Sequence, residues 1–163
     1  MKKVCIIPGT FDPITSGHAD IISRAAYIFD EVTVAAFNNT AKQTTFTAEE
    51  RLEMLRLSYP TYSCNNIKTT MITDKLLVDY MNENDIKVIV KGVRNTIDFD
   101  YEYQLSVISR EINHYGFETL FIPAKPEHMY ISSTFVREMI KYKKDIDDYV
   151  PAQIVEYIKK LKY

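Results

Sequence analysis

Side chains that bind phosphate recur in four short segments, each lying beyond an apolar run of strand-like residues. The segments are residues 8–18, 38–42, 91–94 and 131–134. Lysine supplies a point charge and arginine a planar fork that matches two phosphate oxygens, while hydroxyl groups add neutral donors. Carboxylates are scarce there, Asp12 being the exception. The pattern predicts chemistry at a phosphate group, where positioning and charge neutralisation supply most of the catalysis.

Two of these segments lead into predicted helices, whose first N–H groups and positive dipole end attract anions. In the first, Gly17 would let a ligand approach the helix start, His18 lies in its first turn, and Thr10 offers a hydroxyl. In the second, residues 132–134 place three hydroxyls at a helix start. Plain structural interpretations stay open: Thr15 and the serines can simply cap helices, and His18 can be a surface histidine.

The other two segments supply cations. The ammonium groups of Lys42 and Lys91 are point charges, and the planar guanidinium of Arg94 can bind two phosphate oxygens. Gly92 would allow a ligand to contact the backbone between Lys91 and Arg94. As alternatives, Lys42 can be a solvated loop residue, and residues 91–94 can be an ordinary polar turn. What favours a site is that all four segments follow strands, because the carboxyl ends of parallel strands meet at one edge of a sheet.

The elements that would position these groups alternate between strand and helix. Apolar, β-branched runs predict strands at residues 4–7, 32–37, 67–72, 86–90 and 119–122. Helical spacing and caps predict helices near residues 21–29, 47–56, 74–81 (capped by Asp74), 98–114, 132–140 and 151–161. This order predicts an α/β fold: a single Rossmann-like domain over residues 1–163, with a five-stranded, mostly parallel sheet and helices on both faces.

Composition excludes several classes of protein. With 163 residues, 46% hydrophobic residues and a net charge of −2, the chain is neither disordered nor a basic nucleic-acid binder. Its four glycines fit neither GxGxxG nor the P-loop pattern. Cys5 and Cys64 are too few for a disulfide framework or a zinc site. No segment predicts a membrane span or a leader, so we expect a cytoplasmic protein.

Three motifs together resemble a known family. Residues 8–18, Pro-Gly-Thr-Phe-Asp-Pro-Ile-Thr-Ser-Gly-His, resemble the signature of the nucleotidyltransferase superfamily with the (H/T)xGH motif. Residues 131–137, Ile-Ser-Ser-Thr-Phe-Val-Arg, resemble its second motif. Residues 91–94 and 98–105 narrow the resemblance to the bacterial phosphopantetheine adenylyltransferases, over nearly the whole chain.

The resemblance implies a reaction: ATP and 4′-phosphopantetheine give dephospho-CoA and pyrophosphate, with Mg²⁺, by in-line attack of the substrate phosphate without a covalent intermediate. It implies catalytic roles for His18, as transition-state stabiliser, and for Lys42 and Arg94. Substrate-binding positions would be Thr10, Lys42, Leu77 and Lys91. ATP-binding positions would be Thr10, Phe11, His18, Gly92, Val93, Arg94, Glu102, His128, Met129, Tyr130, Ile131, Ser132, Ser133 and Thr134. It also implies a homohexamer, feedback inhibition by CoA, no protein side chain on the metal, and no nucleic-acid or membrane partner.

The sequence departs from this family at several positions. Lys91 stands where many relatives have arginine, and Ser109 stands where some have an asparagine that contacts the pantetheine arm. Alternative functions are a nicotinate-mononucleotide adenylyltransferase, a cytidylyltransferase, or a non-catalytic adenine-nucleotide sensor. The chain length and residues 98–105 argue against the first.

Overall fold

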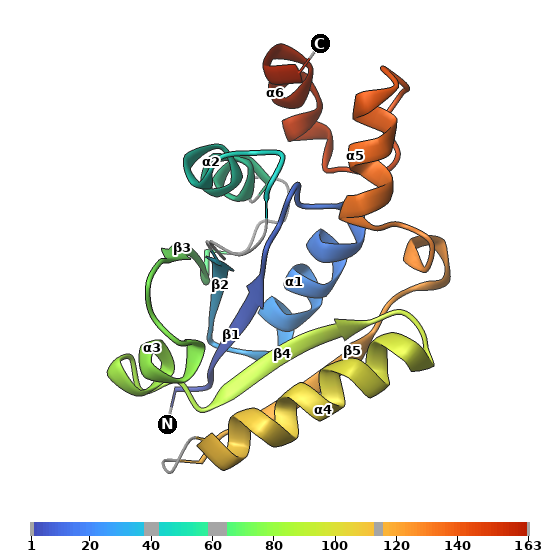
Figure 1. Ribbon diagram of the computed structural model, residues 1–163. Helices are drawn as coiled ribbons and strands as arrows, with labels where there is room; N and C mark the ends of the chain where they lie inside the picture. The colour runs from blue at the N-terminus through green and yellow to red at the C-terminus, as the bar shows by residue number, and fades with distance from the viewer. Residues whose placement is uncertain (1, 38–42, 59–64, 113–115, 163) are drawn as a thin grey trace.

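The computed structural model describes residues 2–37, 43–58, 65–112 and 116–162 (Figure 1). In chain order the elements are β1 (Val4–Gly9), α1 (Ser16–Ile28), β2 (Glu31–Phe37), α2 (Ala48–Ser58), β3 (Ile67–Ile72), α3 (Leu77–Glu83), β4 (Val88–Val93), α4 (Thr96–Ile112), β5 (Glu118–Pro123), the short 3₁₀ helix η2 (Pro126–His128), α5 (Ser133–Lys141) and α6 (Ala152–Lys162). Lys42, Cys64 and His114 lie outside the described residues.

The five strands form one parallel sheet in the order β3-β2-β1-β4-β5. β1 pairs with β2 along its whole length, from Val4 opposite Glu31 to Gly9 opposite Ala36, but meets β4 at Ile6 opposite Ile89. The carboxyl ends of β1 and β4 therefore have space between them. In a doubly wound sheet, ligands bind at this point, where the strand order reverses.

Helices pack on both faces of the sheet, which confirms the predicted fold class. Cys5 and Ile7 of β1 pack in one apolar cluster with buried residues of α1, α2, α5 and α6. Ile6, between them, points to the opposite face and packs with Met81 of α3. α4 runs alongside β4 and has no buried residue (Figure 1). Among the described helices, none combines the length and apolarity that crossing a membrane requires.

The fourth strand differs from the prediction. It spans Val88–Val93 instead of residues 86–90, so residues 91–93 belong to the strand and not to the loop after it. The strand pairs with β5 as far as Val93 opposite Pro123. Gly92 obscured this because glycine is uncommon inside strands. A Cβ at Gly92 would lie 2.9 Å from Cγ1 of Ile21, so this glycine is needed where α1 packs closely on β4.

The start of α3 was also predicted wrongly. The helix begins at Leu77 after Leu76, which makes no side-chain capping bond, and Asp74 has a left-handed backbone with φ of 53° instead of capping the helix. Two other caps are confirmed. The Thr15 hydroxyl oxygen accepts from the His18 N–H at the start of α1, and Ser132 caps α5.

Candidate active site

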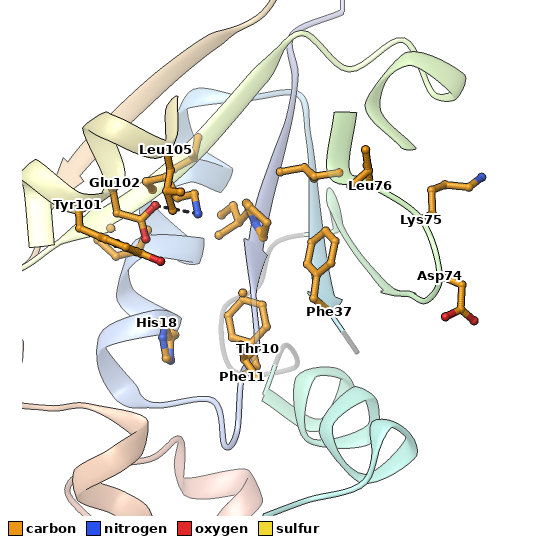
Figure 2. Close-up of a pocket in the computed structure, with 18 residues that line it drawn as sticks. Thr10, Phe11, His18, Phe37, Asp74, Lys75, Leu76, Tyr101, Glu102 and Leu105 are labelled. Atoms are coloured by element: carbon orange, nitrogen blue, oxygen red, sulfur yellow. Dashed lines mark ion pairs between the residues drawn. The ribbon is translucent and has the colours of Figure 1, made fainter. Parts of the chain in front are cut away.

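Two adjoining cavities lie at the carboxyl ends of β1 and β4. The larger, whose lining residues are drawn in Figure 2, has a volume of about 840 Å³. It extends toward α3, where Leu77 lines it. The smaller, of about 240 Å³, extends toward the start of α5, where Ser132 and Ser133 line it. The residues that line both cavities are His18, Ile21, Gly92, Tyr101 and Glu102. His18 and Gly92 therefore mark the junction between the two spaces.

His18 is held by the start of its own helix. Its backbone N–H donates to Thr15 Oγ1 at 3.3 Å, while its ring Nδ1 lies 3.1 Å from Thr15 N and 3.0 Å from Thr15 Oγ1. Because the Thr15 N–H can only donate, Nδ1 accepts, and the ring proton of neutral His18 is on Nε2. Phe11 packs edge-on against the ring, with centroids 5.2 Å apart. The ring thus retains Nε2–H as its donor for a ligand.

The surroundings keep this imidazole uncharged. Burial and, secondarily, the nearby charge of Arg94 lower the pKa of His18 from 6.5 to about 4. Desolvation disfavours the charged ring, and the guanidinium repels it. A neutral donor of this kind suits charge that develops on a phosphoryl oxygen. It does not suit proton transfer at neutral pH, which requires a pKa near the working pH.

Arg94 is oriented by a carboxylate of the following helix. Its Nε and Nη2 donate to the two carboxylate oxygens of Asp98, at 2.8 and 3.2 Å. Its Nη1 donates to the Ile131 carbonyl at 3.3 Å. All three residues line the smaller cavity. The contacts fix the guanidinium at the cavity wall and join the end of β4 to the loop before α5.

Lys91 forms an ion pair with Glu102 in the wall of the larger cavity. The Lys91 Nζ and the Glu102 Oε2 are 2.9 Å apart, and the two side chains are 24% and 23% exposed. The pair joins β4 to α4 near the junction of the cavities, where Figure 2 shows it as a dashed line. Because solvent can reach both groups, a phosphate entering this cavity would compete with Glu102 for the ammonium group.

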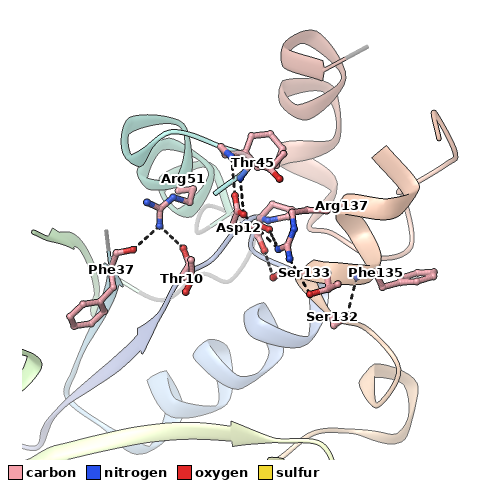
Figure 3. Close-up of polar contacts among 12 residues, drawn as sticks. Thr10, Asp12, Phe37, Thr45, Arg51, Ser132, Ser133, Phe135 and Arg137 are labelled. Atoms are coloured by element: carbon pink, nitrogen blue, oxygen red, sulfur yellow. Dashed lines mark hydrogen bonds and ion pairs between the residues drawn. The ribbon is translucent and has the colours of Figure 1, made fainter. Parts of the chain in front are cut away.

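Asp12 braces the loop between β1 and α1 (Figure 3). Its carboxylate accepts from the backbone N–H groups of Thr45 and Phe46, each at 2.9 Å. Its carbonyl accepts from Arg137 at 2.7 Å, and the peptide bond to Pro13 is cis. Asp12 is 4% exposed. With its oxygens already engaged, this carboxylate holds the loop in place and is not placed to act as a base.

Arg51 of α2 is fully buried beneath the same loop. Its Nη1 donates to the carbonyls of Thr10 and Phe37, both at 2.8 Å (Figure 3). Burial lowers the pKa of the Arg51 guanidinium, while the charge of Asp12 opposes that change. Arg51 thereby ties the end of β1 to the end of β2. Sequence reasoning missed it, because an arginine in a helix with mixed polar and apolar residues is ordinarily exposed.

Most of the predicted site residues come together in the structure. Those that line at least one of the two cavities are Thr10, Phe11, His18, Leu77, Lys91, Gly92, Arg94, Glu102, His128, Ile131, Ser132 and Ser133. Those that line neither are Val93, which is buried, Met129 and Tyr130, which are exposed, and Thr134. Lys42, which falls outside the described residues, has no placement.

The hydroxyls at the start of α5 are already engaged. Ser132 Oγ accepts from the Phe135 N–H, Ser133 Oγ donates to the Pro13 carbonyl at 2.8 Å, and Thr134 Oγ1 accepts from Arg137. Of these three, only Ser133 uses its hydroxyl proton, so an anion at this helix start would be bound by the Ser132 O–H together with backbone N–H groups and the helix dipole.

Sequence reasoning used residues 98–105 for the family resemblance but assigned no role at the site to three of them, Asp98, Tyr101 and Leu105. Asp98, which orients Arg94, follows it by four residues, a spacing that often pairs opposite charges and could have indicated the contact. Tyr101 and Leu105 line the larger cavity from the same helix, and their four-residue spacing is the signal that they share a face.

In the part of the chain that the structure describes, no group of three or more His, Cys, Asp or Glu side chains is placed to hold a metal ion. The carboxylates of Asp12, Asp98 and Glu102 are each engaged by N–H groups or by a cation.

A doubly wound parallel sheet with cationic groups at its carboxyl edge is typical of one class, the nucleotide-binding α/β proteins. The model of the cytidylyltransferase-like family matches residues 6–139, which is most of the chain. At full length the chain is 40% identical over 163 residues to the phosphopantetheine adenylyltransferase of Buchnera aphidicola subsp. Schizaphis graminum, covering 99% of this chain and 97% of that one. It is 42% identical over 154 residues to the enzyme of the same name from Haemophilus influenzae, covering 94% and 96%.

The chain therefore belongs to the phosphopantetheine adenylyltransferase family and is a nucleotidyltransferase. Solved structures show the same fold at lower identity. A nicotinic acid mononucleotide adenylyltransferase from Plasmodium falciparum, complexed with APC, superposes with a TM-score of 0.72 at 17% identity and covers 99% of this chain and 96% of that one. A bifunctional NMN adenylyltransferase/ADP ribose pyrophosphatase from Francisella tularensis gives a TM-score of 0.73 at 14% identity. The match covers 99% of this chain and 49% of that one.

Proposed function

We propose that the chain transfers the adenylyl group of ATP to 4′-phosphopantetheine, giving dephospho-CoA and pyrophosphate, the next-to-last step in making CoA. One observation carries the proposal: His18 lies at the junction of two cavities, with Lys91 on one side and Arg94 on the other. Two phosphate-bearing ligands can meet end to end beside a neutral donor. The names of the relatives support phosphopantetheine as the acceptor.

ATP would occupy the smaller cavity and reach Thr10 and Phe11, which line the larger one, at the junction beside His18. Arg94, the backbone at Gly92 and the start of α5 would contact its phosphates, and His128 and Ile131 would line the space beside them. Phosphopantetheine would occupy the larger cavity, with its phosphate at Lys91 and its arm along Leu77. The phosphate must then displace Glu102 from Lys91, so substrate binding replaces one ion pair with another.

The reaction would be a direct displacement. An oxygen of the phosphopantetheine phosphate attacks the α-phosphorus of ATP in line, a new P–O bond forms, and the bond from the α-phosphorus to the bridging oxygen breaks. Pyrophosphate leaves with that electron pair. A phosphate monoester has a second pKa of about 6, so it is already largely ionised at neutral pH and needs no general base. His18 would donate from Nε2 to a non-bridging α-oxygen as its charge grows.

Mg²⁺ is expected to enter with ATP. It would neutralise charge on the triphosphate and the leaving pyrophosphate. The site fits a metal carried by the nucleotide, because the Asp98 carboxylate is paired with Arg94 and the Asp12 carboxylate accepts two backbone N–H groups. Varying free Mg²⁺ at a constant ATP concentration tests this expectation, and full activity in excess chelator would contradict it.

The decisive assay is the reverse reaction. Incubation with dephospho-CoA and pyrophosphate should yield ATP, whereas nicotinate adenine dinucleotide should not replace dephospho-CoA. ATP from the dinucleotide instead would identify a nicotinate-mononucleotide adenylyltransferase, and nucleotide binding without turnover would identify a sensor.

A matched pair of lysine variants tests the acceptor site. Lys91→Ala should raise the KM for phosphopantetheine, whereas Lys87→Ala, which removes an exposed lysine paired with Asp85 near the opposite end of β4, should not. Lys42→Ala is predicted to behave like Lys91→Ala. Equal effects of Lys87→Ala and Lys91→Ala would remove the basis for placing phosphate at Lys91.

The proposal includes the oligomeric state of the protein and its inhibition by CoA. We expect a homohexamer in a cytoplasmic setting and inhibition by CoA, which shares the pantetheine arm and so should compete with phosphopantetheine. The exposed apolar residues of α4, among them Ile97 and Ile108, are consistent with association. Light scattering and inhibition kinetics with CoA as the varied ligand test both expectations.

A further inference from the structure

The carboxylate of Asp20, which lies outside both cavities, connects α1 to the loop that lines the smaller cavity. Asp20 Oδ1 lies 2.7 Å from the Lys125 Nζ, and its Oδ2 lies 3.3 Å from Arg24 Nη1. The same Arg24 nitrogen donates to the Pro123 carbonyl at 2.8 Å. The Asp20 side chain is 9% exposed, so this cluster is partly shielded from water.

This cluster is placed where the loop has few other contacts. Lys125 directly precedes η2, drawn in orange ahead of α5 in Figure 1, and η2 carries His128 into the wall of the smaller cavity. Other residues of the loop, including Met129 and Tyr130, are exposed. His128 packs beside Gly17 of α1, but the rest of the loop has little apolar packing, so polar contacts contribute much of what fixes its position.

Polar contacts hold the loop near its two ends. At its beginning, the Ala124 N–H donates to the Val93 carbonyl at 2.8 Å, and the Asp20 cluster holds Lys125. At its end, Arg94 donates to the Ile131 carbonyl. Asp20 is two residues beyond His18 on one rigid helix, so a single element carries the donor at the junction and the anchor of the nucleotide wall.

We propose that Asp20 is a positioning residue for the nucleotide: through Lys125 and Arg24 it sets the loop that bears His128 and Ile131 relative to His18. It touches neither ligand itself. This inference rests on the proposed function in taking the smaller cavity as the ATP side. Because small displacements of positioning groups can change rates by as much as about 10²-fold, loss of the anchor should be readily measured.

The test distinguishes an effect on ATP binding from an effect on phosphopantetheine binding. Asp20→Asn should raise the KM for ATP about tenfold while leaving the KM for phosphopantetheine within about twofold. Binding of a non-hydrolysable ATP analogue, measured by calorimetry without an acceptor, should weaken by a similar factor. That measurement does not depend on turnover, so it remains informative even if the proposed acceptor is wrong.

Glu31→Gln is the matched control. Glu31 also bridges two cations, with Lys2 Nζ at 2.7 Å and Lys68 Nζ at 2.8 Å, but it lies at the amino end of β2, away from both cavities. The Glu31→Gln substitution should leave the KM for ATP and the KM for phosphopantetheine unchanged. Lys125→Ala, which removes a half-exposed partner, should reproduce the ATP effect of Asp20→Asn, and the double variant should be no worse than either single one.

Each outcome is decisive. A selective loss of ATP affinity in Asp20→Asn and Lys125→Ala, absent in Glu31→Gln, supports the proposal. Equal losses for both substrates, an unchanged affinity for the ATP analogue, or additive effects in the double variant would overturn it. Should Asp20→Asn not fold, Lys125→Ala alone decides the question by the same two measurements.

Discussion

His18 should remain neutral well below physiological pH, and this can be measured directly. With a pKa of about 4, roughly 0.1% of the ring would be charged at pH 7. The Thr15 N–H donating to Nδ1 further predicts that the neutral ring carries its proton on Nε2. Both features make His18 a fixed hydrogen-bond donor whose charge does not change across the pH range in which the enzyme would work.

The lowered pKa has a consequence for stability. Because the unfolded chain has the ordinary pKa of 6.5, it binds a proton at His18 between pH 6.5 and pH 4 that the folded chain does not bind. The free energy of unfolding should therefore fall as the pH is lowered through this window and be insensitive to His18 above pH 7. The resulting loss of stability between pH 7 and pH 5 should be about 1–2 kcal/mol.

Two measurements test this reasoning. Heteronuclear NMR of the histidine rings, assigned with His18→Gln, gives the tautomer and the titration midpoint. Urea unfolding of the wild type and His18→Gln from pH 5 to pH 8 gives the stability difference, which should shift in favour of the variant as the pH falls. A His18 midpoint above pH 6, a proton on Nδ1 in the neutral ring, or a pH-independent stability difference would refute the account.

Three further predictions concern substitutions and substrates. His18→Ala should leave ATP affinity within a few-fold but lower turnover by roughly 10²–10³, because a donor acting in the transition state is lost; parallel losses in calorimetric ATP affinity and kcat would make His18 an ordinary ligand contact. With wild-type protein, pantetheine lacking its phosphate should be a very poor substrate, because that phosphate is both the attacking group of the proposed displacement and the group that would take Lys91 from Glu102; comparable kcat/KM values for the two acceptors would contradict the proposed reaction. Arg51→Leu leaves the carbonyls of Thr10 and Phe37 without their buried donor, so it should cost about 3–5 kcal/mol and lower the melting temperature by about 10 °C in calorimetry; an unchanged melting temperature would show that the brace is dispensable.

Much of the architecture follows from local patterns in the sequence. Apolar, β-branched runs bounded by polar turns are sufficient to locate five strands, and their alternation with helices leaves a parallel sheet as the simplest arrangement. Helix caps are equally local, because the Thr15 and Ser132 hydroxyl oxygens accept hydrogen bonds from backbone N–H groups three residues further on. Because parallel strands end at one edge, the sequence alone is enough to assign Thr10, His18, Lys91 and Arg94 to a common site.

Only the tertiary structure shows the properties that depend on residues far away in the sequence, namely burial, contact partners and charge state. Gly92 looked like a turn residue, but it lies within β4, because Ile21 of α1 packs where its side chain would be. Nothing in the local sequence distinguishes Arg51 from a surface cation, yet it is buried and donates to carbonyls at the ends of two strands. The neutrality of His18 likewise arises from burial and from Arg94, 76 positions away. Local spacing determines which groups reach the edge of the sheet, but long-range packing sets their burial, partners and charge.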